Sequence, residues 1–201
     1  MAEPATSTDV FNSIIDMYST TETFCLLSKS MSYCCPTQTP SAIVLKTSVL
    51  LAGSVVIGAM LGGASDEDCR HLRRFAVELG LAFQLQDDLL DSYGGEELGK
   101  TIGGDILAGK KSYLMVTAMS RADEEQREVL RHTYKDAALA PAEKIARVRA
   151  VFDALDVPRL TEQQISLRFD RALATLDGLN VPDARKEPLR EYARSLMGRR
   201  K

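Results

Sequence analysis

Three aspartates lie close together near the middle of the chain, in the D-D-x-x-D sequence of Asp87, Asp88 and Asp91. Apolar residues around them recur at helical spacing, which predicts a buried helix with one polar strip that also contains Gln84. On such a helix Asp87 and Asp91 are about 5–6 Å apart at Cβ. Their repulsion costs roughly 3 kcal/mol at an effective dielectric of about 20, so the cluster either takes up protons or binds cations. Carboxylate oxygens suit Mg²⁺ together with phosphate oxygens, and a solvated acidic helix face is the alternative interpretation.

The segment after the aspartates, residues 94–111, is rich in glycine and lysine. Its glycines let the backbone approach a ligand closely. Lys100, Lys110 and Lys111 supply ammonium groups that suit phosphate oxygens. Asp105 is interpreted either as the cap of the next helix or as a group that supports the metal ligands. Aspartates, glycines and lysines together predict a diphosphate site bridged by Mg²⁺.

These motifs resemble those of a known family. The sequence F-Q-x-x-D-D-x-x-D followed by G-K-x-x-G-G-D-I-x-x-x-K-K is similar to the second aspartate-rich motif of the trans-isoprenyl diphosphate synthases, the polyprenyl synthetase family. The L-K-T-x-x-L-L sequence of residues 45–51 and the basic end at residues 198–201 resemble the same family. The resemblance runs from about Val44 to Lys201 and implies an all-α, isoprenoid-synthase-type antiparallel helical bundle.

The resemblance also implies a prenyltransferase reaction. An allylic diphosphate ionises with the help of Mg²⁺, and the allylic cation alkylates isopentenyl diphosphate. Metal and lysine charges favour departure of the diphosphate. The implied metal ligands are Asp87 first, then Asp88 and Asp91. Asp105 is implied to support these ligands without binding the metal itself. The implied catalytic residues are Lys46, Thr47 and Lys100, and the implied substrate-binding residues are Gln84, Lys100, Lys110, Arg199 and Arg200.

Residues 1–42 depart from the family pattern. Serine and threonine are frequent there, periodicity is unclear, and D-D-x-x-D occurs nowhere else in the chain. The family's first aspartate-rich motif and its basic segment for isopentenyl diphosphate have no counterpart. We therefore expect an aberrant or poorly ordered segment at 1–42, followed at 43–201 by the carboxyl-terminal portion of a helical prenyl synthase domain. A truncated or rearranged synthase, with little turnover on its own, is the resulting hypothesis.

Three other functions are compatible with parts of this pattern. A non-catalytic diphosphate-binding subunit would become active only with a fuller synthase subunit. A terpene cyclase shares the fold and one D-D-x-x-D, but its Asn/Asp-x-x-Ser/Thr-x-x-x-Glu motif has no convincing match here. A purely structural helical module leaves the glycine and lysine segment unexplained. The family implies a homodimer, so a homodimer or a heteromer with a fuller subunit is the expected assembly.

Composition excludes several further classes. A net charge of −3 and the absence of tryptophan give no support for nucleic-acid binding. Residues 47–64 carry no charge, but glycines and a serine dilute their hydrophobicity, so we interpret them as a buried core helix that also meets a second subunit, not as a stable membrane span. The start of the chain has no signal-peptide pattern, which favours the cytoplasm, and the four cysteines are expected to be free thiols.

The remaining elements that position the site are all predicted to be helices. Ser65 is a predicted N-cap of the long helix that carries the aspartates. Further helices are predicted at about 105–121 and 123–135, from Pro141 to a stop at Val157 and Pro158, from a capping box at Thr161 to Gly178, and from about 183 to Met197. This gives roughly seven or eight antiparallel helices.

Overall fold

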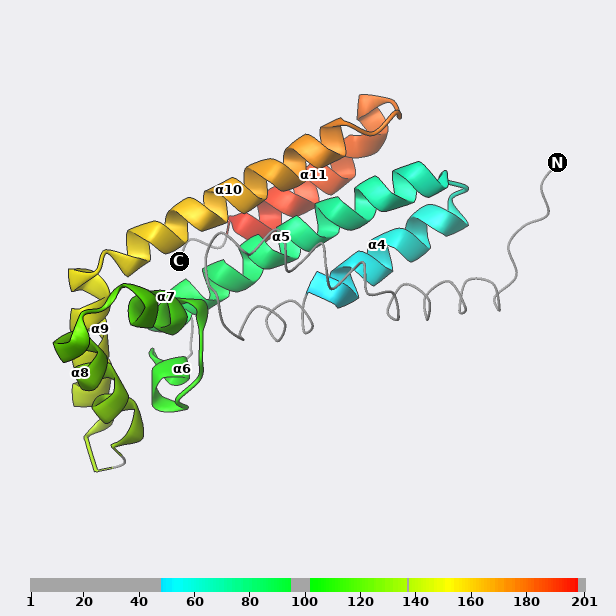
Figure 1. Cartoon of the computed structure of the whole chain (residues 1–201). Coiled ribbons are helices and arrows are strands. Elements are labelled where there is room, and N and C mark those ends of the chain that lie inside the picture. The colour runs from blue at the N-terminus through cyan, green and yellow to red at the C-terminus, as the bar shows by residue number, and fades with distance from the viewer. Residues whose placement is uncertain (1–47, 95–101, 137, 199–201) are drawn as a thin grey trace. The chain divides into compact units, whose positions relative to one another are not determined.

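The computed structural model describes residues 48–94, 102–136 and 138–198, and every regular element within these ranges is a helix (Figure 1). The all-α prediction is therefore confirmed, whereas the segment 1–42 lies outside the described residues. The helices are α4 (Val49–Leu61), α5 (Asp66–Tyr93), α6 (Gly104–Leu107), α7 (Tyr113–Arg121), α8 (Glu124–Lys135), α9 (Pro141–Ala154), α10 (Val157–Asp177) and α11 (Asp183–Met197).

The described residues form two compact units. The first contains α4, α5 up to Leu81, α10 from Arg168, and α11 to Ser195. The second contains α5 from Ala82, helices α6 to α9, and α10 up to Leu167. The acidic motif, α6 and the start of α7 all belong to the second unit.

In the first unit, α5 begins and packs as its sequence predicts. The Asp68 amide donates to Ser65 Oγ at 3.1 Å, which confirms Ser65 as the N-cap. Further along, Gly80 lies against the start of α4, where an added Cβ would be 2.8 Å from Ser48 Oγ. Arg168 of α10 donates to both carboxylate oxygens of Glu78, at 2.9 and 3.1 Å. The middle of α5 therefore contacts the start of α4 and α10.

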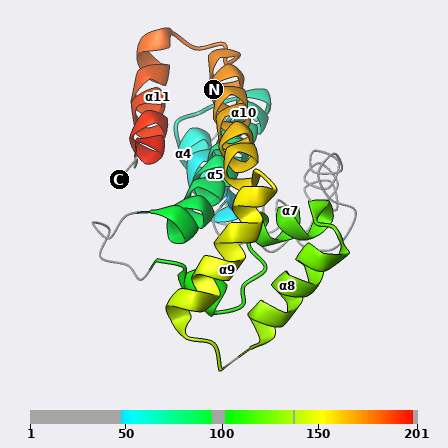
Figure 2. The ribbon, with the colours of Figure 1, turned by 90° about the vertical axis from the view of Figure 1, so that its left-hand side faces the viewer.

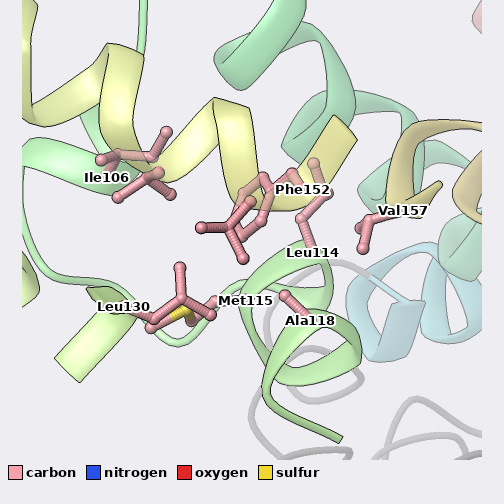
Figure 3. Close-up of a cluster of buried hydrophobic side chains, with 9 residues drawn as sticks. Ile106, Leu114, Met115, Ala118, Leu130, Phe152 and Val157 are labelled. Carbon is pink, nitrogen blue, oxygen red and sulfur yellow. The ribbon is translucent and has the colours of Figure 1, made fainter. Parts of the chain in front are cut away.

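In the second unit, a core of nine buried apolar residues joins α6, α7, α8, α9 and the first residue of α10 (Figure 3). Helix α9 contacts α6, α7 and α8, and it lies beside α8 (Figure 2). Phe152 and Leu114 are fully buried in this core. The core residues are Ile106, Leu114, Met115, Ala118, Leu130, Val148, Val151, Phe152 and Val157.

The single helix predicted at 105–121 is wrong. Gly109 adopts a left-handed conformation, with φ at 64°, just after α6. Ser112 then caps α7, because its Oγ accepts a hydrogen bond from the Met115 amide at 3.4 Å. A left-handed glycine and a serine cap end one helix and begin another, despite continuous helical spacing of the apolar residues.

The stop predicted at Val157 and Pro158 is also wrong, as is the capping box at Thr161. Helix α10 begins at Val157, and Pro158 occupies its first turn, where a missing N–H leaves no hydrogen bond unmade. Thr161 is buried inside the helix, and its hydroxyl donates to the Val157 carbonyl at 2.8 Å. The break between α9 and α10 instead includes Asp156, a left-handed residue with φ at 58°. The helices predicted at 123–135, from Pro141 and from 183 agree with α8, α9 and α11.

The prediction that residues 47–64 form a buried core helix is wrong for the described residues. Within α4 only Ala52 and Gly53 are buried, whereas Leu50 and Leu61 are 68% and 75% exposed. No helix in the described part of the chain combines the length and the apolar character needed to cross a membrane.

Candidate functional site

Asp88 is a buried carboxylate whose two oxygens both accept hydrogen bonds. Gln84 Nε2 donates to Asp88 Oδ1 at 3.0 Å, and the backbone amide of Tyr113 donates to Asp88 Oδ2 at 3.1 Å. Burial raises the pKa of Asp88, and repulsion from Asp105 and Asp87 adds to this, while the two hydrogen bonds act in the opposite direction. Asp88 therefore fastens the first residue of α7 to α5.

Asp91 fastens the start of α6 to α5 in the same way. Its Oδ2 accepts from the Asp105 amide at 2.8 Å, and its backbone carbonyl accepts from the Gly103 amide at 2.6 Å. Burial raises the pKa of Asp91; the charges of Asp105 and Asp87 add to this, while the Asp105 amide and the Lys110 ammonium oppose it. Two of the three motif aspartates thus hold backbone amides of the segment that follows.

Asp105 and Lys110 form an ion pair next to these two carboxylates. Lys110 Nζ donates to Asp105 Oδ1, and the side chains are 64% exposed for Lys110 but only 14% for Asp105. This hydrogen bond, together with the charges of Asp105, Asp91 and Asp88, raises the pKa of Lys110. The lysine therefore keeps a positive charge at the edge of the acidic cluster.

Asp87 is the one motif aspartate with an exposed side chain. Within the described ranges, no three histidine, cysteine or acidic side chains converge closely enough to hold a metal ion by themselves. Mg²⁺ typically takes one or two carboxylates, several waters and substrate phosphate oxygens, so this donor set fits Mg²⁺ bound together with a diphosphate. Asp87 is the exposed carboxylate of the motif, and its neighbours Asp88 and Asp91 accept hydrogen bonds from backbone amides.

Gly103 allows α6 to lie close to α9. It adopts φ of 76° as the N-cap of α6, and an added Cβ would be 2.7 Å from Ile145 Cδ1. A left-handed backbone and this close approach both favour glycine here. The hydrogen bond from the Gly103 amide to the Asp91 carbonyl depends on that geometry.

Gly103→Ala is expected to lower the free energy of unfolding by about 2 kcal/mol, because it adds backbone strain and a steric contact with Ile145. The matched control is Gly109→Ala, where φ is 64° but no atom lies within 4 Å of the added Cβ. That control should lose only about 1 kcal/mol from strain. Urea denaturation of both variants measures the difference, and equal losses would contradict a steric role for Gly103.

The structure joins five of the predicted site residues in one region of the second unit: Gln84, Asp88, Asp91, Asp105 and Lys110. Asp87 lies directly before Asp88 on the same helix. The other predicted residues, Lys46, Thr47, Lys100, Arg199 and Arg200, lie outside the described residues, and their roles stay predictions.

Sequence reasoning missed two contributors to this region. The Tyr113 amide is a backbone group, so the residue type at that position cannot predict its hydrogen bond. Tyr134 of α8 has its pKa raised by burial first, and the negative charges of Asp105 and Asp91 add to this. A single tyrosine in an amphipathic helix carries no sequence signal for such a position.

Comparison with known proteins identifies the family. The pattern of the family described as "Polyprenyl synthetase" matches residues 15–154, beginning upstream of Val44. A chloroplastic geranylgeranyl pyrophosphate synthase of Catharanthus roseus is 41% identical over 107 residues, covering 53% of this chain and 30% of the relative. "Heterodimeric geranylgeranyl pyrophosphate synthase large subunit 2" of Arabidopsis thaliana is 45% identical over 95 residues, covering 47% and 24%.

Solved structures agree in fold. A crystal structure of geranylgeranyl pyrophosphate synthase matches with a TM-score of 0.77 and 26% identity, over 98% of this chain and 63% of the other. The enzyme from Corynebacterium glutamicum, complexed with isoprenyl diphosphate and magnesium, gives a TM-score of 0.72 and 32% identity over 80% and 46%. The chain thus spans less than two thirds of these structures and less than a third of the curated relatives above. Because the family pattern covers more than half of the chain and the helical fold is shared, the chain belongs to the polyprenyl synthetase family.

Proposed function

We propose that this chain binds the diphosphate of an allylic prenyl diphosphate together with Mg²⁺, for prenyl transfer to isopentenyl diphosphate. The observation that carries the proposal is the difference in exposure and hydrogen bonding among the three motif aspartates. Asp88 and Asp91 accept hydrogen bonds from the Tyr113 and Asp105 amides, while Asp87 is the exposed member of the motif. Family membership and the bound magnesium and isoprenyl diphosphate named for one structural relative support it.

The residues have distinct tasks in this proposal. Asp87 supplies the exposed carboxylate for the metal, and Mg²⁺ when bound withdraws charge from the leaving diphosphate. Asp88 and Asp91 keep α6 and α7 against the end of α5, and Gln84 orients Asp88. The flexible, positively charged side chain of Lys110, paired with Asp105, would contact a phosphate oxygen of the diphosphate. Lys46, Thr47, Lys100, Arg199 and Arg200 complete the proposed diphosphate contacts by family resemblance.

A second candidate is a diphosphate-binding subunit that works only with a fuller synthase. One relative is named as the large subunit of a heterodimeric enzyme, and the present sequence carries a single D-D-x-x-D motif. The proposed assembly is therefore a homodimer or such a heteromer. Turnover that appears only when this chain is mixed with a synthase subunit would favour the second candidate. We keep the cytoplasm as the proposed location, although several relatives are named as chloroplastic or mitochondrial.

Removal of Mg²⁺ is expected to weaken geranyl diphosphate binding roughly 100-fold, about 2.7 kcal/mol. Without the positive charge of the metal, the motif carboxylates repel the negatively charged diphosphate. Calorimetric titration with and without Mg²⁺, with a chelator in the second case, measures this loss. Equal heats in both solutions would argue against a metal-bridged site. Absence of binding at every Mg²⁺ concentration would overturn the proposed function.

A further inference from the structure

Three consecutive residues at the start of α6 contact Asp91. The Gly103 amide donates to the Asp91 carbonyl at 2.6 Å, and the Asp105 amide donates to Asp91 Oδ2 at 2.8 Å. Between them, Gly104 lies beside the other carboxylate oxygen, because a Cβ added at Gly104 would be 3.2 Å from Asp91 Oδ1. The two carboxylate oxygens of Asp91 therefore have different neighbours, namely a backbone amide and a residue without a side chain.

The backbone of α6 does not require a glycine at position 104. Gly103 and Gly109, on either side of α6, have left-handed φ of 76° and 64°, but Gly104 does not belong to the positive-φ residues of the described chain. It is the first residue of α6, where alanine would favour the helix more than glycine does. Outside its own helix and its chain neighbours, Asp91 Oδ1 is the one described atom within 4 Å of the added Cβ. Gly104 is thus distinguished by the space that it leaves beside a carboxylate oxygen.

This space is suited to a water molecule bound to a metal. Asp91 Oδ2 is engaged by the Asp105 amide, so Oδ1 is the oxygen of this carboxylate with both lone-pair sites left for other donors. Asp91 follows Asp87 by one helical turn of α5, with about 5–6 Å between the two Cβ atoms. Mg²⁺ keeps several waters when one or two carboxylates bind it. A water of a metal held by Asp87 is therefore a suitable donor to Asp91 Oδ1.

We propose that Gly104 is a positioning residue of the metal site, because its missing side chain keeps Asp91 Oδ1 accessible to a water of Mg²⁺ bound at Asp87. Asp91 then has two tasks, since Oδ2 accepts the Asp105 amide while Oδ1 accepts the metal-bound water. A side chain at position 104 would fill the space beside Oδ1, and the carboxylate could not turn away without weakening its bond to the Asp105 amide. This inference rests on the proposed function, because the metal concerned is the one that binds with the diphosphate.

The test is Gly104→Ala in the full chain, with calorimetric titration of geranyl diphosphate in Mg²⁺ and thermal denaturation without ligand. The affinity is expected to fall about tenfold, about 1.4 kcal/mol. The melting temperature should stay the same or rise, because alanine is the better helix former at a position without positive φ. In an Asp91→Asn background, Gly104→Ala should have little further effect. The amide oxygen of the asparagine accepts the Asp105 N–H there, so its NH₂ group faces Gly104 and cannot accept a hydrogen bond.

The matched control is Gly58→Ala in α4 of the first unit, where no described atom lies within 4 Å of the added Cβ. It makes the same substitution in a helix and should leave the affinity unchanged. Unchanged affinity of Gly104→Ala, or an equal loss in the Asp91→Asn background, would overturn the positioning role while leaving the proposed function in place. A lower melting temperature of Gly104→Ala would also overturn it, because Gly104 would then serve the fold. Failure of the unaltered chain to bind at all would instead overturn the proposed function, and the positioning role with it.

Discussion

Replacement of Asp87 by alanine is expected to abolish Mg²⁺-dependent binding of geranyl diphosphate, a loss of roughly 100-fold or more, about 2.7 kcal/mol. Asp87 is the exposed carboxylate of the motif, whereas Asp88 and Asp91 are less exposed and accept hydrogen bonds from backbone amides. The free energy of unfolding should change by less than about 0.5 kcal/mol, as is usual for surface substitutions. Any change should be favourable, because Asp87 repels Asp88 and Asp91.

Calorimetry with Mg²⁺ and urea denaturation measure these two quantities on the same preparations. The matched control is Asp170→Ala, an exposed aspartate on α10 far along the chain from the motif. It should lose no affinity, since the same charge is removed from the first unit and not from the motif. Retained Mg²⁺-dependent binding in Asp87→Ala would show that other carboxylates bind the metal. It would refute the separate roles proposed for the three aspartates.

Replacement of Asp88 by alanine is expected to have the opposite profile, with a loss of about 3 kcal/mol in the free energy of unfolding. The substitution leaves the Gln84 amide and the Tyr113 backbone N–H without the acceptor that both now use. Burial raises the pKa of Asp88, so its ionised form is already held at some cost, and the loss is smaller than two charged hydrogen bonds would give. Diphosphate binding should fall as well, because the start of α7 is released.

A graded series makes this prediction specific. Asp88→Asn keeps one acceptor oxygen and should lose roughly half as much stability as Asp88→Ala. Hydrogen exchange of the Tyr113 amide reports the bond directly and should accelerate in both variants, but not in Asp87→Ala. A stable Asp88→Ala protein with a protected Tyr113 amide would show that α7 is held by its apolar core alone.

Local sequence determined most of the helices, because their signals act within a few residues. The Ser65 cap, the proline at the start of α9 and the apolar spacing of α5 depend on neighbouring backbone groups and side chains. The same local reasoning failed at Gly109 and Ser112, where an uninterrupted helical pattern hid a break. It failed again at Pro158, which is compatible with both a stop and a first turn. A pattern that permits two outcomes is resolved by the packing of its apolar residues on other helices.

The candidate site divides in a similar way. Residue types and spacing predicted the acidic cluster, because D-D-x-x-D on a helix places carboxylates one turn apart whatever surrounds them. The family was indicated by the resemblance of the motifs. The resemblance ranked Asp87 ahead of Asp88 and Asp91, but only the tertiary structure shows how their surroundings differ, since that depends on which amides of α6 and α7 reach each carboxylate. Burial and hydrogen-bond partners are properties of the packed chain, so the motif by itself cannot determine them.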